Sequence, residues 1–336
     1  MTTMPAEWEP HDRTWMAFPP DTETSSDLDA EGLAEVRLGW AAVAAAIVDY
    51  EPVTMVVRAD DEEAARAVLD PRVDLHIADL DDAWMRDMGP TFVHDVDGSV
   101  AAIDWIFNGW GAQEWASWEN DSLIGRIVAR SAGAVVLDSP MVNEGGGIHV
   151  DGVGTVLVTE TVQLDPGRNP TWSKPDVEAE LIRTLGVEKI VWLRRGLTRD
   201  YEPLGTRGHV DIVACFSDTN TLLVHDQRNP EHPDHEVTAE VVEILEDAGD
   251  WNIVRVPAPQ TIVNDEGWVD WSYINHYVCN GAVILCAFDD PNDDVAADIL
   301  RSAYPGREIV LVDARVIFSR GGGIHCITQQ QPSPRL

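Results

Sequence analysis

Five polar side chains of the types used in covalent catalysis stand in short motifs spread along the chain. The motifs WMRD, NEGGGIH, GHVD and GGGIHC contain Asp87, Glu144, His209, Asp211 and Cys326. A cysteine thiolate attacks an electrophilic carbon, and a histidine of suitable pKa transfers protons. Carboxylates hold a planar cation through paired hydrogen bonds, as they hold the arginine side chain. The motifs therefore predict nucleophilic attack on a bound planar cation.

The carboxylates also affect the thiol. Their negative charge should raise the pKa of Cys326 above the value of about 8.5 that a free cysteine has. A bound cation offsets this charge, so we expect the substrate to assist formation of the thiolate.

No cysteine lies in a CxxC pair, which argues against a disulfide scaffold. The other cysteines are interpreted as packing residues: Cys215, Cys279 and Cys286.

Histidines and tryptophans supply further candidates. His149 and His325 occupy equivalent positions in the two glycine motifs and are interpreted as hydrogen-bonded structural residues. The pair at positions 232 and 235 has a metal-like spacing, but its loop is polar and broken by proline, which predicts a surface position without a metal. Trp84 and Trp110 can stack on a cation. Core packing is the alternative for both, because the chain has 13 tryptophans.

Turn and strand patterns predict how these motifs are positioned. Four β-hairpins are expected around Gly98, Gly152, Thr219 and Gly281. A helical pattern and a β-branched strand follow each of them, so the repeated unit is strand, strand, helix, strand. The expected helices are residues 120–131, 176–185, 236–248 and 292–303, and the strands after them are 134–137, 189–193, 252–256 and 308–312.

The two ends of the chain predict a fifth unit. Strands 14–18 and 53–57 and helix 33–48 would join a C-terminal strand at 324–329. This pairing closes a ring through the termini and removes exposed sheet edges. No linker interrupts the pattern, so we predict a single α/β domain over residues 1–336. Equivalent positions of a radial array converge on its axis, which brings the five polar side chains together.

The two glycine motifs are an internal sequence repeat. Residues 145–149 and 321–325 both read GGGIH. Successive glycines mark either tight turns or backbone that approaches a ligand closely, and the sequence leaves both open.

Charge is the extreme feature of the composition. The 336 residues include 59 acidic and 23 basic side chains, for a formal net charge of −36. Such a charge disfavours nucleic acids and anionic membranes as partners. It favours a cationic substrate, with a solvated acidic surface as the alternative. No targeting or membrane-spanning pattern is found, so we expect a cytoplasmic protein, and the sequence leaves homo-oligomer formation open.

Nine ordered segments resemble the agmatine deiminase family, which includes bacterial peptidylarginine deiminase-type domains. They are TWMAFP, WMRDMGPTF, FNGWG, NEGGGIHVDGVGT, RNPTWSKPDVEAEL, LGVEKIVWLRRGL, GHVDIVACF, SYINHYVCNGAVIL and GGGIHCITQQQP. They cover the chain from about Trp8 to Pro332. The resemblance implies the five-fold pseudosymmetric α/β propeller of the guanidine-modifying enzymes, with no metal or organic cofactor.

The resemblance also implies roles for the five residues. Cys326 is the nucleophile, His209 the general acid and base, and Glu144 the partner of the histidine. Asp87 and Asp211 grip the guanidinium group. The implied hydrolase forms a covalent thiouronium and converts agmatine to N-carbamoylputrescine and ammonia, a step of putrescine and polyamine metabolism.

Four positions depart from the family pattern: Arg207, Ile212, Arg320 and Gly323. An arginine beside a site for a dication favours a carboxylate-bearing guanidino substrate, such as arginine or a guanidino acid, with Arg207 or Arg320 as its partner. A solvent-facing intersubunit ion pair is the other interpretation. Contacts with the substrate are expected from Trp84, Gly323 and Arg207 besides the two aspartates. An amidinotransferase and a non-catalytic binding propeller are the remaining alternatives.

Overall fold

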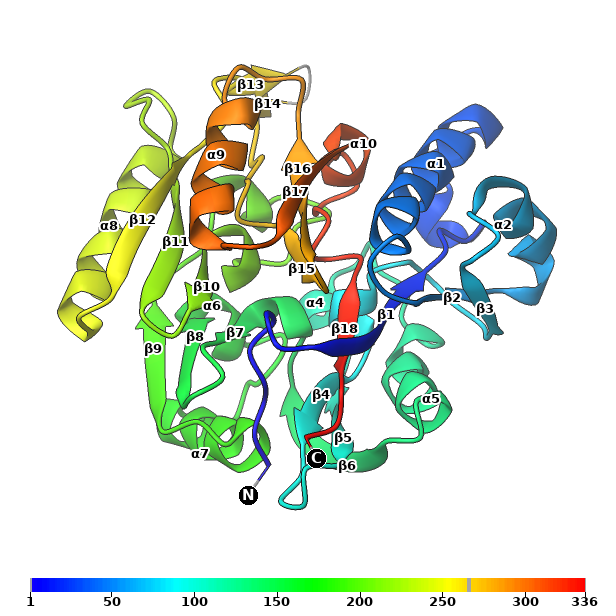
Figure 1. The fold of residues 1–336 in the computed structure, drawn as a ribbon, viewed down its shortest axis with the longest axis horizontal. Helices are drawn as coiled ribbons and strands as arrows, with labels where there is room; N and C mark the ends of the chain where they lie inside the picture. The colour runs from blue at the N-terminus through cyan, green and yellow to red at the C-terminus, as the bar shows by residue number, and fades with distance from the viewer. Residues whose placement is uncertain (1, 265–266, 336) are drawn as a thin grey trace.

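The computed structural model describes residues 2–264 and 267–335, and five of its sheets repeat one pattern (Figure 1). In each, an antiparallel pair of strands is extended by a parallel strand. Four of these sheets are β4 (Thr91–His94), β5 (Val100–Ile106) and β6 (Val135–Val142); β7 (Ile148–Val150), β8 (Thr155–Thr159) and β9 (Lys189–Leu193); β10 (Ala214–Asp218), β11 (Thr221–Asp226) and β12 (Asn252–Pro257); and β15 (Tyr277–Cys279), β16 (Ala282–Ala287) and β17 (Glu308–Asp313). The four predicted hairpins are confirmed.

The fifth sheet joins the two ends of the chain. Strand β1 (His11–Ala17) pairs antiparallel with β18 (Gln329–Pro332) and parallel with β2 (Val53–Val57), and β3 (Asp74–Ile77) extends the sheet. Figure 1 shows β1 and β18 side by side near the centre of the view. The closure through the termini is confirmed, and five units of one topology agree with the expected α/β propeller.

The predicted strand at 324–329 is wrong in its position. Residues 324–327 form turns, and the strand begins at Gln329. The carbonyl of Cys326 accepts a hydrogen bond from the backbone N–H of Arg86, 3.0 Å away, so this segment bonds to another unit before it enters the sheet. The displacement places the cysteine in a turn.

A helix connects the second and third strands of each unit. These helices are α1 (Ala30–Ile47), α5 (Ile124–Ser131), α7 (Lys174–Leu185), α8 (Asp234–Ala248) and α9 (Asp293–Ala303), close to the predicted ranges. In α7, Ser173 and Asp176 form a capping box, and Gly186 ends the helix at φ 68° in the left-handed region. Its buried residues Val177 and Leu181 face one hydrophobic cluster of the core.

The remaining elements are short. They are α2 (Glu62–Val68), α3 (Met85–Met88), α4 (Gly109–Ala112), α6 (Glu160–Gln163), α10 (Arg315–Phe318), β13 (Val263–Asn264), β14 (Gly267–Trp268), and the 3-10 turns η1 (Glu23–Ser25), η2 (Ala59–Asp61), η3 (Asp121–Leu123), η4 (Gly145–Gly147), η5 (Thr198–Tyr201) and η6 (Val210–Ile212). Several of them face the centre of the fold, where η4 contacts both α3 and η6. These three elements carry or adjoin the predicted polar residues other than Cys326.

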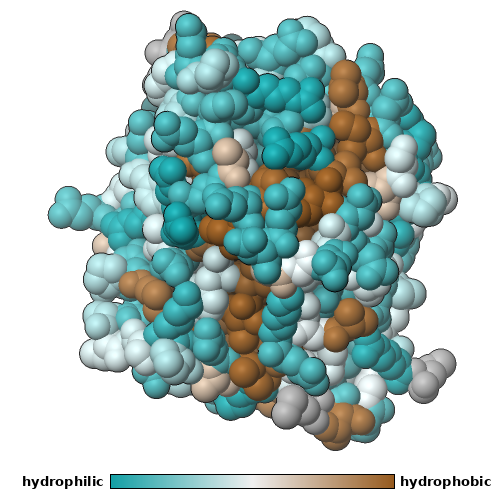
Figure 2. All heavy atoms as spheres, turned by 90° about the vertical axis from the view of Figure 1, so that its left-hand side faces the viewer, coloured by the Kyte–Doolittle hydropathy of each residue, from teal (hydrophilic) through white to brown (hydrophobic). Residues whose placement is uncertain are grey.

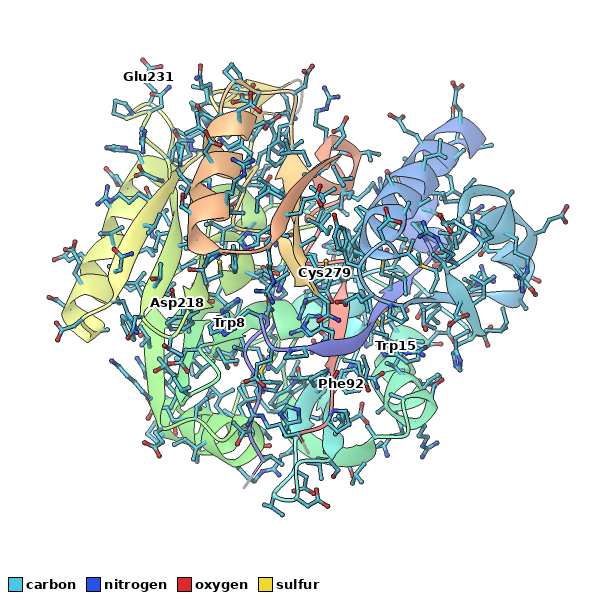
Figure 3. The ribbon with its side chains drawn as sticks, viewed as in Figure 1. Trp8, Trp15, Phe92, Asp218, Glu231 and Cys279 are labelled. Carbon is cyan, nitrogen blue, oxygen red and sulfur yellow. The ribbon has the colours of Figure 1, made fainter. Side chains whose placement is uncertain are left out.

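The interior and the surface differ as the composition predicts. The cysteines expected to pack in the core are buried and unpaired, and Figure 3 shows Cys279 inside the fold, while Asp218 and Glu231 point outward. The face in Figure 2 is largely hydrophilic and interrupted by apolar stripes. Among the described residues, no helix combines the length and the apolar composition that a membrane crossing requires.

Candidate active site

The five predicted polar side chains meet in one buried place. Asp87 comes from α3, Glu144 directly precedes η4, and His209 and Asp211 stand at the start of η6. Cys326 lies in the turn before β18. None of the five residues is more than 3% exposed. The convergence expected of a radial array therefore exists.

His209 lies between two carboxylates. Its Nε2 is 3.3 Å from Oε2 of Glu144, and its Nδ1 is 3.8 Å from Oδ1 of Asp87. Burial works against the charged ring, but Asp87, Glu144 and Asp211 outweigh it and raise the pKa of His209 to about 9. The imidazole is therefore protonated at neutral pH and can donate a proton.

Glu144 is held by an arginine that the sequence analysis did not single out. Arg168 Nε lies 2.9 and 3.0 Å from the two carboxylate oxygens, and both side chains are fully buried. Nη1 and Nη2 of Arg168 bind Asp165 at 2.8 Å and the Thr206 carbonyl at 2.7 Å. Against the effect of burial, Arg168 and His209 lower the pKa of Glu144 to about 2. The only sequence signal was the position of Arg168 in RNPTWSKPDVEAEL.

The pKa values of the two aspartates are shifted in opposite directions. Burial raises the pKa of Asp87 to about 6, although His209 opposes this. Trp110 Nε1 donates to Oδ2 of Asp87 at 2.9 Å, and the Gly146 backbone donates to Oδ1 at 3.0 Å. For Asp211, burial is outweighed by His325, whose Nδ1 lies 2.8 Å from Oδ2, and the pKa is lowered. The indole N–H of Trp110 thus holds the carboxylate of Asp87 in place.

Two polar atoms at the centre have no hydrogen-bond partner among the described residues. They are Nδ1 of His209 and Oδ1 of Asp211, and both are buried. Buried polar atoms are nearly always hydrogen-bonded. A ligand with several N–H groups would supply the missing donors for the carboxylate.

The thiol of Cys326 borders the same place. Its Sγ lies 3.6 Å from Oδ2 of Asp211, and Nδ2 of Asn275 lies 3.3 Å from Sγ. Burial, together with the charges of Asp211 and Asp87, raises the pKa of the thiol well above its ordinary value. This direction agrees with the expectation from the sequence. Asn275 is a second residue that the sequence analysis missed, although it stands in SYINHYVCNGAVIL.

The glycine motifs let the backbone approach these groups. A Cβ atom on Gly146 would lie 2.5 Å from Nδ1 of His209 and 3.0 Å from the carboxylates of Asp87 and Asp211. A Cβ atom on Gly322 would lie 3.0 Å from Sγ of Cys326. Close approach is therefore the reason for glycine at these two positions. At Gly321 the reason for glycine is a tight turn, because its φ of 108° lies in the left-handed region.

Trp84 borders both the nucleophile and a narrow cavity. Its ring would lie 2.8 Å from a Cβ on Gly322, the same atom that would contact Cys326. Trp84 also packs edge-on against Trp40 at 5.6 Å, so it belongs to the core as well. The cavity beside it is lined by Trp115, Leu204, Arg320 and other side chains. The residues described as lining this cavity include Trp84 but not Cys326.

The two additional arginines are paired with carboxylates. Arg207 Nη1 lies 3.0 Å from Asp165, outside the group of five, and its side chain is 36% exposed. Arg320 Nη1 and Nη2 lie 2.6 and 3.0 Å from the two oxygens of Asp27. The described contacts of Arg207 thus bring it to Asp165 and not to the predicted substrate-binding aspartates.

The other two departures are explained by packing. Ile212 is buried in a hydrophobic cluster with Val210 and Val213. A Cβ atom on Gly323 would lie 2.5 Å from Oδ1 of Asn275 and 2.6 Å from the Phe318 ring, so only glycine fits there without rearrangement. The Gly323 backbone also hydrogen-bonds Cys326.

The histidines outside the centre divide into two groups. His149 and His325 make buried hydrogen bonds, as predicted, and His325 connects Asp211 to Glu7 at 2.7 Å. The predicted surface position is wrong for His232, which is 3% exposed. Its ring turns inward, where Nε2 lies 3.1 Å from the Val269 carbonyl. Among the described residues no cluster of potential metal ligands occurs, and this pair forms none.

Comparison with known proteins places this geometry in a family. The model of the Porphyromonas-type peptidyl-arginine deiminases matches residues 3–332. The chain belongs to this family. A Streptomyces coelicolor protein named "Putative agmatine deiminase" is 58% identical over 335 residues, or 98% of each chain. An agmatine deiminase of Pseudomonas aeruginosa is 38% identical over 99% of this chain and 96% of its own.

A solved structure shows the same fold in an enzyme of this type. The agmatine deiminase of Enterococcus faecalis, described as catalysing its reaction, superimposes with a TM-score of 0.90. It is 30% identical, and the match covers 100% of this chain and 96% of that one. The family and the enzyme class inferred from the sequence motifs are thereby confirmed, as a hydrolase of carbon–nitrogen bonds.

Proposed function

We propose that the protein deiminates agmatine to N-carbamoylputrescine and ammonia. The observation that carries the proposal is the buried group of a thiol, a protonated imidazole and two aspartates around the unpaired Oδ1 of Asp211. A guanidinium ion fits it because the ion has N–H donors on every side and a positive charge. The agmatine deiminases among the relatives support the same substrate.

The first half-reaction forms a covalent intermediate. Asp87 and Asp211 bind the guanidinium, whose charge lowers the pKa of the Cys326 thiol, and the thiol proton leaves to solvent. The thiolate attacks the guanidinium carbon and forms the C–S bond. The imidazolium of His209 gives its proton to one amino group, which departs as ammonia and leaves a thiouronium cation. His209 is then neutral and stays hydrogen-bonded to Glu144.

The second half-reaction hydrolyses the intermediate. Neutral His209 takes a proton from water as the water oxygen attacks the same carbon. The C–S bond then breaks and returns its electron pair to the sulfur of Cys326. The hydroxyl proton leaves to solvent, where ammonia takes it up, and the product is a urea. Glu144 stabilises the imidazolium in both half-reactions.

The arginine contacts favour an amine-tailed substrate. Arg207 and Arg320 are the side chains that could recognise a carboxylate, and each is already paired, with Asp165 and Asp27. A carboxylate would have to displace one of these partners. The net charge of −36 also attracts the dication more strongly than a zwitterion. We further propose that the catalytic unit is the whole chain, and that it acts on a free small molecule in the cytoplasm without a nucleic-acid partner.

Ammonia release by the purified protein tests the proposal. The panel contains agmatine, arginine, a blocked arginine peptide and guanidino acids, each without an added amine acceptor, and Cys326→Ala is the control. We expect turnover of agmatine that Cys326→Ala abolishes. Preference for a carboxylate-bearing guanidine would overturn the substrate assignment. A parallel assay contains an added amine. If no compound releases ammonia and the amidino group is transferred to the added amine, the protein is an amidinotransferase.

A further inference from the structure

Asn275 is buried beside the thiol of Cys326 and the backbone carbonyl of Asp211. The residue is fully buried and lies just before β15. Its Nδ2 lies 3.3 Å from Sγ of Cys326 and 3.4 Å from the Asp211 carbonyl. The mechanism above does not use it.

The orientation of the carboxamide follows from its other contact. Oδ1 of Asn275 lies 3.0 Å from the backbone nitrogen of His325, which can only donate. The oxygen therefore accepts from this N–H, and the amino group, which also donates to the Asp211 carbonyl, is the donor at the sulfur, although Oδ1 lies 3.5 Å from the same Sγ. The backbone of Gly323 packs against the same carboxamide, since a Cβ on Gly323 would lie 2.5 Å from Oδ1. The neighbours thus fix a donor at the sulfur.

The sulfur needs such a donor because its other neighbours oppose ionisation. Oδ2 of Asp211 lies 3.6 Å away, and Asp87 adds a second negative charge. The backbone of Gly323 and the amide of Asn275 are the groups described at the sulfur that favour the thiolate. Hydrogen bonds to a charged atom are about twice as strong as those between neutral groups.

We propose that Asn275 is a further catalytic residue, whose carboxamide donates to Sγ of Cys326 and stabilises the attacking thiolate. The role in turnover rests on the proposed deiminase function. The contact with the sulfur, and its effect on ionisation, do not depend on which substrate is used. The two statements can therefore be tested separately.

The test compares Asn275→Ala and Asn275→Asp with the wild type. Asn275→Asp keeps the shape and the acceptor for His325 but replaces the donor at the sulfur. The rate of Cys326 alkylation by iodoacetamide is measured against pH, with Cys326→Ala correcting for the other thiols. Asn280→Ala is the matched control, because Asn280 also binds backbone through both amide atoms, at His11. Thermal unfolding shows whether each variant is folded.

We expect both Asn275 variants to move the alkylation profile to higher pH and to slow alkylation near neutrality by about 10-fold or more. In turnover of agmatine, kcat should fall by about 10- to 100-fold while KM changes little. Asn280→Ala should keep the wild-type profile. An unchanged profile in a folded Asn275→Asp protein would overturn the inference. Absence of agmatine turnover in the wild type, with the profile still shifted, would overturn only the proposed function.

Discussion

Replacing Arg168 with glutamine tests the role of the buried Arg168–Glu144 ion pair, because Glu144 in turn binds the general acid His209. The change leaves the Glu144 carboxylate without its two hydrogen bonds from Nε and removes one donor each from Asp165, which keeps Arg207, and from the Thr206 carbonyl. Removing one partner of a buried ion pair lowers the free energy of unfolding by about 3–5 kcal/mol. The pKa of Glu144 agrees in direction, because Arg168, together with His209, lowers it to about 2 against the effect of burial.

The pH dependence of this effect has a defined sign. A carboxyl group with a lowered pKa stabilises the folded state above its ordinary pKa, and the stabilisation is lost as pH falls toward the folded value. The variant should therefore be less stable than the wild type by about 3 kcal/mol near neutral pH. The difference should shrink below about pH 4.5. Since Glu144 stays ionised above about pH 4.5 and raises the pKa of His209, removing the neighbouring Arg168 charge should move the alkaline limb of kcat to higher pH in the variant.

The assay is denaturant unfolding of both proteins at several pH values, followed by the pH profile of kcat. Arg183→Gln is the control, because Arg183 pairs with a largely buried glutamate, Glu180, but is itself 52% exposed. That pair should contribute at most about 1 kcal/mol. If Arg168→Gln loses no more stability than Arg183→Gln and keeps the wild-type pH profile, the reasoning about the buried connection is refuted.

Four further outcomes are expected. Gly146→Ala should abolish deimination while the protein stays folded, because its Cβ would lie 2.5 Å from Nδ1 of His209, and wild-type turnover would contradict the close approach. In the wild type, kcat should fall above about pH 9 as His209 loses the proton that it gives to ammonia, and a flat profile to higher pH would exclude it as the acid. Ultraviolet titration should find no Cys326 thiolate at neutral pH without substrate, whereas a fully formed thiolate would refute assistance by the substrate. Arg207→Ala should leave the ratio of agmatine to arginine turnover unchanged, since Asp165 already binds Arg207, and a change in that ratio would make Arg207 a specificity residue.

Much of the fold could be predicted because its signals are local. The hairpin turns at Gly98, Gly152 and Gly281 have φ values of 83°, 74° and 82°, which glycine adopts readily. The helices follow from periodic apolar positions and end signals such as Gly186. The C-terminal strand was misplaced because the position of Cys326 is set by a hydrogen bond to Arg86, far away in the sequence. Local propensity carries no information about such a contact.

The linear pattern of residues shows which chemical groups are present, how their motifs are spaced, and that the units repeat until the termini meet. It predicted that five side chains converge: Asp87, Glu144, His209, Asp211 and Cys326. The contacts of each group could be found only in the folded chain: Arg168 holds the glutamate, and Asn275 lies against the sulfur. The first contact joins two segments of one unit and the second joins different units, and the effects of both on protonation depend on burial and on distances of a few ångströms. A linear pattern fixes neither quantity, because both arise only when the units pack around a common centre.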